Sequence, residues 1–260
     1  MPRGGLSLLD MKRAFDPLEP ELMDRPQPVT PELEAYMRNL VSLNRYFGSY
    51  RLIRKFLAQW FVPGRTYRVL DLCTGVGDIP RLMVDWARKA GVTLCIDAVD
   101  FHESTLELAK RGSEKYPEIH FLRGDVLKYE TRETYDLVTC SLALHHFSDE
   151  DAVVLLKRCR NLSHRFVLVS DLERTLRASI GVLLLTSLFY RLPMTQADAN
   201  TSVQRAFSFA EMRALAEAAG WENFGHMRFL FCRQAIWLDE RTAGDIPAVA
   251  AVPEVLPCPT

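Results

Sequence analysis

Two glycines separated by a single residue, Gly75 and Gly77, follow a short apolar run and precede a segment with helical character. The run over residues 67–72 is rich in β-forming side chains and predicts a buried parallel strand. Residues 79–86 predict a helix, with Asp78 as its N-cap and Gly91 just beyond its end. Glycines in such a strand–turn–helix unit let the backbone approach a ligand that lies across the carboxyl end of the strand.

An acidic residue indicates which ligand fits this turn. Asp71 lies within it, the third glycine of a dinucleotide-binding loop is replaced by Pro80, and no Lys-Ser or Lys-Thr pair follows. A carboxylate repels a phosphate and attracts a cation, so a dinucleotide loop and a P-loop are both disfavoured. S-adenosylmethionine carries an ammonium and a sulfonium group and no phosphate. The turn therefore favours S-adenosylmethionine, and an ordinary tight turn between strand and helix is the alternative.

Polar residues also follow the next predicted strands. The strand over residues 92–99 ends at Asp100, where a ribose hydroxyl finds an acceptor in nucleoside-binding folds, although Asp100 also suits the cap of the next helix. A strand over residues 120–123 is followed by Gly124, Asp125 and Val126, and one over residues 135–141 is followed by residues 142–147, which include two histidines.

These four motifs, in this order and at this spacing, resemble those of the class I S-adenosylmethionine-dependent methyltransferases. The resemblance covers residues 68–171, with a weaker continuation to about residue 239. It rests on the stretch 69–77, on Asp100, on the stretch 124–126 and on the stretch 141–147. The chain departs from the family at Cys73, which stands where the family has its first loop glycine, but a small residue is kept.

The resemblance implies the α/β Rossmann-like methyltransferase fold. This is a doubly wound, seven-stranded, mostly parallel sheet with an antiparallel last strand, an N-terminal helical cap and an insert after strand 5. We expect an N-terminal segment and helical cap over residues 1–62 and a methyltransferase domain over residues 63–240. The substrate-lid insert is expected over residues 172–207, and residues 241–260 are expected to form a disordered tail.

The resemblance also implies roles in binding S-adenosyl-L-methionine, which becomes S-adenosyl-L-homocysteine. Asp71, through its turn, orients the methionine end, Asp100 accepts from the ribose hydroxyls, and Asp125 accepts from the adenine amine with Val126 behind the ring. The join between two N-terminal helices either closes over the cofactor or serves only as a packed cap. The full set of expected cofactor-binding residues is Asp71, Cys73, Thr74, Gly75, Gly77, Asp100, Phe101, Gly124, Asp125, Val126, Ser141, Leu142, His146, Arg45 and Tyr46.

Methyl transfer from a sulfonium is an in-line displacement in which alignment of the reactants supplies most of the catalysis. A hydroxyl acceptor also benefits from a base, and histidine suits that work near neutral pH. His146 is the first candidate for the catalytic base and His145 the second, because both follow the fourth strand at the edge where cofactor and acceptor meet. The alternative is that both histidines only shape the loop or contact the cofactor. No cluster of residues has metal-ligand spacing along the chain, so no metal is expected.

The insert after the fifth strand is apolar and resembles one in methyltransferases that act on small aromatic or polyketide-like compounds of secondary metabolism. Members of that group often carry His-Asp where this chain has Ala197-Asp198. The expected substrate-binding residues are Phe189, Tyr190, Asp198 and Arg205. The sequence thus predicts methylation of a hydroxyl on a small, aromatic or polyketide-like molecule. Methylation of carbon or nitrogen, as in quinones or amines, and a non-catalytic cofactor-binding partner protein are the alternatives.

Composition and charge indicate the partners and the compartment to expect for this protein. The 260 residues are 48% hydrophobic and carry a formal net charge of −1, which gives no general attraction to nucleic acid. The six cysteines form no Cys-x-x-Cys motif, which predicts reduced thiols in a cytoplasmic protein without a zinc site. Neither a signal pattern nor a transmembrane segment is predicted. We expect a monomer or homodimer that acts on a small molecule.

Overall fold

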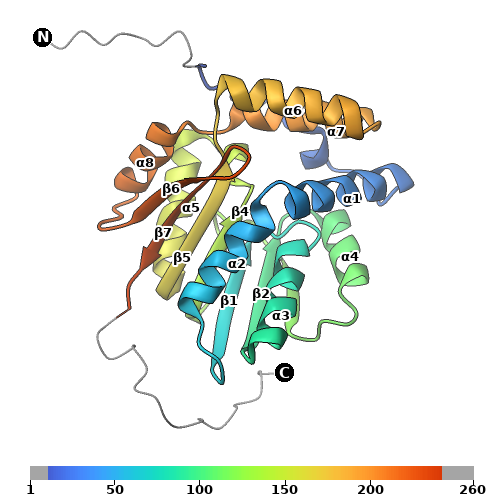
Figure 1. Ribbon diagram of the computed structural model, residues 1–260. Coiled ribbons are helices and arrows are strands. Elements are labelled where there is room, and N and C mark those ends of the chain that lie inside the picture. Colours follow the sequence, from blue (N-terminus) through green and yellow to red (C-terminus); the bar gives the residue numbers. More distant parts are fainter. Residues whose placement is uncertain (1–10, 242–260) are drawn as a thin grey trace, which may run out of the picture.

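The computed structural model describes residues 11–241, which form a seven-stranded sheet in the order β3-β2-β1-β4-β5-β7-β6 with helices on both faces (Figure 1). The strands are β1 (Thr66–Leu72), β2 (Thr93–Asp100), β3 (Ile119–Arg123), β4 (Tyr135–Ser141), β5 (Ser163–Leu172), β6 (Gly225–Phe229) and β7 (Arg233–Asp239). The α-helices are α1 (Pro31–Tyr46), α2 (Ser49–Trp60), α3 (Asp78–Ala90), α4 (Glu103–Gly112), α5 (Asp149–Leu162), α6 (Leu176–Phe189), α7 (Pro193–Arg205) and α8 (Phe209–Ala218). Two 3₁₀ turns are η1 (Leu22–Asp24) and η2 (Leu144–His146).

The first five strands run parallel and their carboxyl ends are aligned. Leu72 pairs with Val99 of β2 on one side and with Cys140 of β4 on the other. The last strand, β7, runs antiparallel to both β5 and β6. This topology confirms the predicted doubly wound sheet with an antiparallel last strand. It also brings the residues that follow β1, β2, β3 and β4 to one edge of the sheet.

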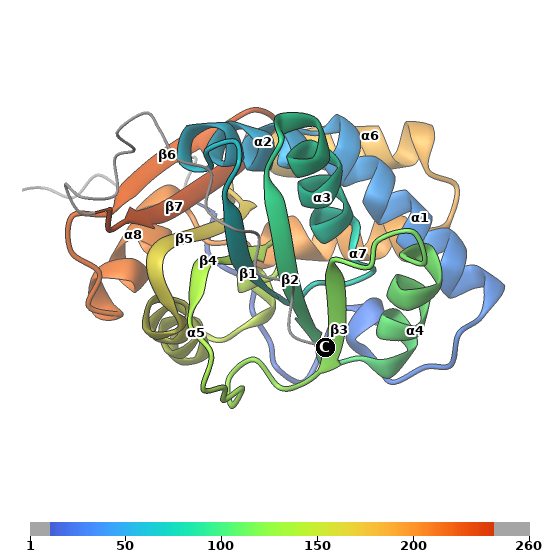
Figure 2. The same ribbon diagram turned by 90° about the horizontal axis from the view of Figure 1, so that it is seen from below.

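Alternation along the strands divides the core between the two faces of the sheet. Val69 packs with Phe56 of α2 and Met83 of α3, whereas the next residue, Leu70, packs with Leu155 of α5 on the opposite face. Helices α2 and α3 accordingly lie on one side of the sheet and α5 and α8 on the other (Figure 2). Successive strand side chains point to opposite faces, so two separate apolar layers follow from one strand sequence.

Local signals fix most helix ends. Thr30 Oγ1 accepts from the Leu33 amide at 3.1 Å and Pro31 is the first residue of α1, as expected for a capped helix start. Ser208 and Glu211 form a reciprocal capping box at the start of α8. The expected cap of α3 is wrong by one residue: Gly77, with φ 71°, is the N-cap and Asp78 is already helical. The left-handed conformation of Gly77 lets the chain turn directly into the helix.

Helices α6 and α7 lie across the carboxyl edge of the sheet, beside α1 (Figure 1). They form the insert after β5, and α7, which the sequence did not predict as a helix, begins at Pro193. Two of the leucines on α6 are largely exposed, Leu184 at 57% and Leu188 at 75%. None of the helices between residues 11 and 241 is both long and apolar enough to cross a membrane.

The described part of the segment before α1 wraps the domain. Arg13 forms an ion pair of 2.6 Å with Asp149 at the start of α5 and donates to the Phe147 and Arg205 carbonyls. Farther along, η1 packs against α7. The N-terminal segment therefore closes over the same edge of the sheet as the insert. The predicted disordered tail, apart from Arg241, lies outside the described residues.

Candidate functional site

The turn after β1 has three residues in the left-handed region: Cys73 at φ 58°, Gly75 at φ 57° and Gly77 at φ 71°. A Cβ on Gly77 would come within 2.8 Å of the Phe121 ring, so glycine is required there for space as well as for conformation. Cys73 adopts the conformation of the family glycine at a steric cost of about 1–2 kcal/mol. The predicted turn therefore keeps its shape despite the cysteine.

Acidic side chains gather around this turn. Asp71 is 2% exposed, and burial, together with the nearby charges of Asp78 and Asp100, raises its pKa to about 8. Burial also raises the pKa of Asp78. A cationic ligand would stabilise the ionised form of these carboxyls, whereas a phosphate would oppose it, so the turn favours a cationic ligand. The sequence likewise disfavours a P-loop at this turn.

Asp100 ties the end of β2 to the turn. Its Oδ2 accepts from the Gly75 amide at 2.8 Å and its Oδ1 accepts from the His102 amide at 3.0 Å. The Gly124 amide donates to the Asp100 carbonyl at 3.0 Å, which places the turn after β3 alongside.

Of the residues that follow, Val126 is buried and Phe101 is 58% exposed. Asp125 Oδ1 accepts from the Leu127 amide at 3.0 Å. Asp71, Asp100 and Asp125 thus lie along one edge of three neighbouring strands, and their individual roles remain predictions.

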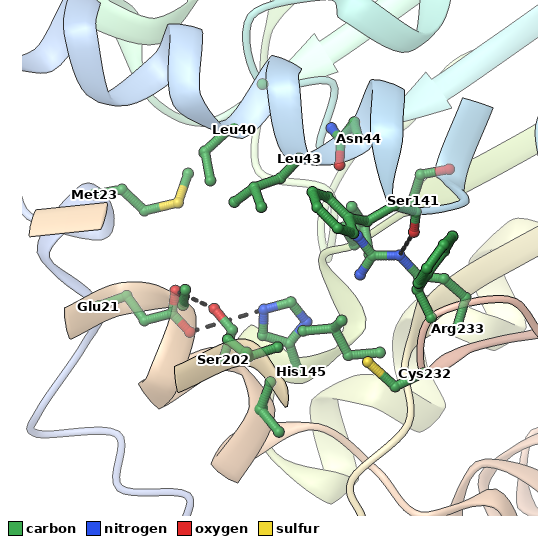
Figure 3. A pocket seen from close by; sticks show the side chains of 18 of the residues that line it. Glu21, Met23, Leu40, Leu43, Asn44, Ser141, His145, Ser202, Cys232 and Arg233 are labelled. Carbon is green, nitrogen blue, oxygen red and sulfur yellow. Dashed lines mark hydrogen bonds and ion pairs between the residues drawn. The ribbon is translucent and has the colours of Figure 1, made fainter. Parts of the chain in front are cut away.

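A cavity of about 630 Å³ opens beside the turn, between α1, η2, α6 and α7 (Figure 3). Its wall is largely apolar. The lining includes Met23, Leu40, Leu43, Val76, Leu142, Leu172, Val182, Leu185, Val203 and Phe231. Asp71 and Thr74 border it at the turn, so one continuous space joins the turn to the insert.

The polar end of this cavity centres on His145, which is buried. Its main-chain amide donates to Asp171 Oδ2 at 2.8 Å, and its Nδ1 lies 2.7 Å from Asp171 Oδ1. Its Nε2 lies 3.8 Å from Glu21 Oε1. Ser202 on α7 donates to the other oxygen of Glu21 at 2.8 Å. Two strand ends, the N-terminal segment and the insert therefore meet at one imidazole.

His146 has a different environment. Its Nδ1 lies 2.7 Å from Asp24 Oδ2. Burial opposes the charged imidazole, but the carboxylates of Glu21, Asp24 and Asp171 outweigh burial and raise the pKa of His146 to about 10. An imidazole that already carries its proton at neutral pH does not suit a general base. His145, predicted as the second candidate for the catalytic base, is therefore the better candidate.

The helical join lines the cavity through other residues than those predicted. Asn44 and Phe47 border the cavity, and Asn44 donates to Asp78 Oδ2 at 3.0 Å. Arg45 is exposed and Tyr46 is 63% exposed, and neither borders the cavity. Residues 40, 43, 44 and 47 share one face of the helix, and residues 45 and 46 lie on another. The join thus borders the cavity through Asn44 and Phe47, and Arg45 and Tyr46 lie on another face.

None of the four residues predicted to contact the substrate borders this cavity. Phe189 is 73% exposed, and the hydroxyl of buried Tyr190 lies 3.1 Å from Ser42 Oγ. Asp198 accepts from the Leu22 amide at 2.8 Å, and Arg205 donates to the Asp16 carbonyl at 2.8 Å. Asp198 and Arg205 hold the N-terminal segment in place, which corrects their assignment as substrate ligands.

Sequence reasoning missed Glu21 and Asp24, because they lie in an irregular segment with no motif around them. Asp171 was recognised as the end of a strand but was given no role. Among the cysteines, Cys73, Cys140, Cys159 and Cys232 are free thiols, as predicted. Cys95 is disulfide-bonded, which corrects the expectation of six reduced thiols, and Cys258 lies outside the described residues.

Comparison with known proteins agrees with this geometry. Residues 69–164 match the family model described as "Methyltransferase domain". These residues form a class I S-adenosylmethionine-dependent methyltransferase domain. The match begins in the strand before the glycine turn and ends at the start of β5, so it contains Asp71, Asp100, Asp125 and both histidines of η2.

Curated relatives of this methyltransferase domain act on quinones according to their names. The 2-phytyl-1,4-naphtoquinone methyltransferase of Thermosynechococcus vestitus is 30% identical over 104 residues, 40% of this chain and 45% of that protein. The demethylmenaquinone methyltransferase of Thermotoga maritima is 30% identical over 127 residues, 47% of this chain and 51% of that protein. The chain thus spans about half the length of the curated relatives it matches.

Solved structures share the fold at lower identity. The plantazolicin methyltransferase BpumL in complex with SAH superposes with a TM-score of 0.60 at 11% identity and covers 81% of this chain and 89% of that one. Human N-acetylserotonin methyltransferase in complex with SAM gives a TM-score of 0.57 at 22% identity, over 81% of this chain and 57% of that one. These likenesses support the fold of the methyltransferase domain.

Proposed function

We propose that this protein transfers a methyl group from S-adenosylmethionine to a hydroxyl of a small, largely apolar molecule. The observation that carries the proposal is the continuous cavity, which has an acidic glycine turn at one end and a histidine–carboxylate cluster at the other. A cationic donor fits the first end. An acceptor with an apolar body and one polar reacting group fits the second.

The donor is proposed to bind with its methionine end at the turn and its adenosine along the ends of β2 and β3. Asp100 keeps lone pairs beyond its two bonds to backbone amides, so it can also accept from ribose hydroxyls. Asp125 and Val126 are proposed to hold the adenine. In this placement the sulfonium methyl faces the cavity beside Asp71.

The acceptor is proposed to lie under α6 and α7, with its hydroxyl toward His145. The oxygen lone pair forms the new bond to the methyl carbon, and the carbon–sulfur bond breaks with its electron pair left on sulfur. The product thioether is neutral and needs no acid. Enclosure by apolar walls removes water and raises the pKa of a phenol, so transfer of the hydroxyl proton to the His145 imidazole at the polar end assists the reaction. Asp171, bonded to His145 Nδ1, orients the imidazole for this step.

Carbon methylation of a quinone-type acceptor is the second candidate. The names of the curated relatives favour it, and an apolar cavity suits a quinone ring as well as a phenol. The two candidates predict different products from similar acceptors. A methyl ether and a C-methyl group have the same added mass, so NMR of the product is needed to assign the methylated atom.

The test is an acceptor screen with isotopically labelled S-adenosylmethionine across phenols, polyketide-like aromatics and reduced naphthoquinones. The proposal predicts titratable binding of S-adenosylmethionine and label in at least one aromatic acceptor. Label on carbon would transfer the assignment to the second candidate. Absence of cofactor binding would contradict both candidates.

A further inference from the structure

One ligand atom from each of Glu21, His145 and His146 lies within 4.8 Å of the other two at the polar end of the cavity. Figure 3 shows Glu21 and His145 facing one another there. We propose that these three residues bind one divalent transition-metal ion. No metal is expected from the sequence, because the carboxylate is more than a hundred positions away from the histidines along the chain. The site depends on the N-terminal segment lying against η2.

The carboxylate oxygen that faces the histidines lacks a hydrogen-bond partner. Glu21 is 2% exposed, and its Oε1 accepts no hydrogen bond although it is fully buried. The other oxygen accepts from Ser202, which fixes the orientation of the carboxylate. A buried carboxylate oxygen without a partner is costly, and a cation between Glu21 and the imidazoles would remove that cost.

Both imidazoles are held in the manner typical of metal ligands. A metal-bound histidine usually donates its second ring N–H to a carboxylate, which fixes the tautomer and the direction of the ring. The Nδ1 of His145 lies 2.7 Å from Asp171, and the Nδ1 of His146 lies 2.7 Å from Asp24. With Nδ1 as the donor in each ring, Nε2 keeps its lone pair for a metal.

The charge balance also favours a cation of high charge. Glu21, Asp24 and Asp171 place three carboxylates against two imidazoles. When a metal ion replaces the proton that His146 otherwise carries, both imidazoles are neutral and the three carboxylates give the cluster a formal charge of −3. A dication would neutralise most of this charge at the point where the donor atoms converge.

The donor set indicates the class of metal. Two imidazole nitrogens and one carboxylate oxygen suit zinc, iron(II), cobalt or nickel, whereas magnesium prefers oxygen ligands alone. Bonds of about 2.0–2.2 Å to such an ion place neighbouring donors roughly 3–3.5 Å apart. The 3.8 Å between His145 Nε2 and Glu21 Oε1 therefore needs an inward shift of less than about 1 Å.

Three protein ligands leave coordination positions open toward the cavity. The role of the ion in catalysis rests on the proposed function: an acceptor hydroxyl bound there would have a lower pKa and lose its proton to water before its oxygen attacks the methyl carbon. His145 would then act on the hydroxyl through the metal and would not take the proton itself. Metal binding by itself does not depend on the reaction.

The experiment uses the full chain, stripped with a chelator and free of any histidine tag. Zinc is titrated by calorimetry and cobalt by its visible ligand-field bands. We expect one ion per chain. The variant Asp171→Asn, which changes only a partner of a ligand, should weaken binding by about 10–100-fold, and Glu21→Gln should weaken it at least as much.

A matched control uses His164→Ala, because His164 is half exposed at the start of β5 and lies outside the cluster. This variant should bind zinc like the wild type, and circular dichroism verifies the fold of each variant. Absence of zinc and cobalt binding would overturn the inference, as would binding that Glu21→Gln and Asp171→Asn leave unchanged. A parallel titration with S-adenosylmethionine separates the two proposals: cofactor binding without metal binding contradicts only the metal site. Metal binding without cofactor binding contradicts only the proposed function.

Discussion

The two ends of the cavity are built in different ways. The donor end consists of Asp71, the glycine turn and Asp100, which lie within thirty residues of one another and follow two paired strands. The acceptor end brings together Glu21, His145, Asp171 and Ser202 from four separate parts of the chain. A site formed by adjacent strand ends can be recognised from a local sequence motif. A site formed by packing across the fold has no local motif.

The two ends also differ in how their acids are balanced. At the donor end burial raises the pKa of Asp71, with a further contribution from the nearby charges of Asp78 and Asp100, and burial also raises the pKa of Asp78. At the acceptor end burial acts against Asp171 in the same way, but the charge and hydrogen bond of His145 outweigh it and lower the pKa of Asp171. Each end favours a cation, but the acceptor end combines carboxylates with imidazoles, whereas the residues of the donor end named above are acids alone.

Replacing His145 by alanine should impair catalysis at the acceptor end and leave cofactor binding at the donor end intact. Turnover should fall by about 10²–10⁴-fold, because a positioned imidazole or its metal no longer assists loss of the hydroxyl proton. Affinity for S-adenosylmethionine, measured by calorimetry, should change by less than about twofold, because His145 contacts no part of the glycine turn. His164→Ala is the control. A parallel loss of cofactor affinity would show that the two ends are not separable.

The converse variant is Asp100→Ala at the donor end. It should weaken binding of S-adenosylmethionine by about 1–3 kcal/mol, since a charged acceptor is lost and the Gly75 amide loses its partner. Turnover at saturating cofactor should be affected less than the affinity. Asp85→Ala on the exposed side of α3 is the matched control. Unchanged affinity in the Asp100 variant would contradict its proposed role.

A pair of substitutions on α6 tests which side of the lid meets the acceptor. Leu185 borders the cavity, and Phe189 on the next turn is 73% exposed. Leu185→Ala should raise KM by an amount equivalent to about 1–2 kcal/mol of lost apolar contact. Phe189→Ala should change KM by less than about 0.5 kcal/mol, as is usual for exposed positions. The reverse pattern would restore Phe189 as a substrate contact.

The smallest expected effect concerns the charge of Asp71. Its pKa of about 8 means that a cationic donor binds better as the carboxyl ionises, so affinity should rise roughly fivefold between pH 7 and pH 8. Asp71→Asn should abolish this rise, and because the donor's own ammonium titrates equally in both proteins, the difference between them isolates Asp71. Identical pH profiles would contradict the assignment.

Stability gives an independent check on Asp71. Its pKa is higher in the folded protein than the ordinary value of 3.8, so the folded state keeps a proton that the unfolded state loses. The free energy of unfolding should therefore fall as pH rises from about 4 through 8. In Asp71→Asn this contribution is absent, and denaturant melts at pH 6 and pH 8 should differ less than in the wild type.

The sequence was informative where hydrophobic periodicity and turn-forming residues determine the structure of a few neighbouring positions. It predicted the parallel strands and the glycine turn, and the structure bears out these elements with boundaries shifted by a few residues. The join between the first two helices borders the cavity. The sequence prediction named Arg45 and Tyr46 there because one sequence does not reveal which face of a helix meets the cavity.

The amino-acid order by itself determined the sheet edge and the acids that line it, because parallel strands in one sheet align their carboxyl ends wherever the rest of the chain lies. Only the tertiary structure decided the polar end of the cavity. Whether Glu21 approaches His145 depends on how the N-terminal segment crosses α7, where Asp198 and Arg205 hold it by bonds to backbone groups. Hydrogen bonds to backbone groups leave no spacing pattern in the sequence, because any residue type can supply the backbone partner. Two of the four residues predicted as substrate ligands, Asp198 and Arg205, are thus the ones that hold the segment carrying Glu21 in place.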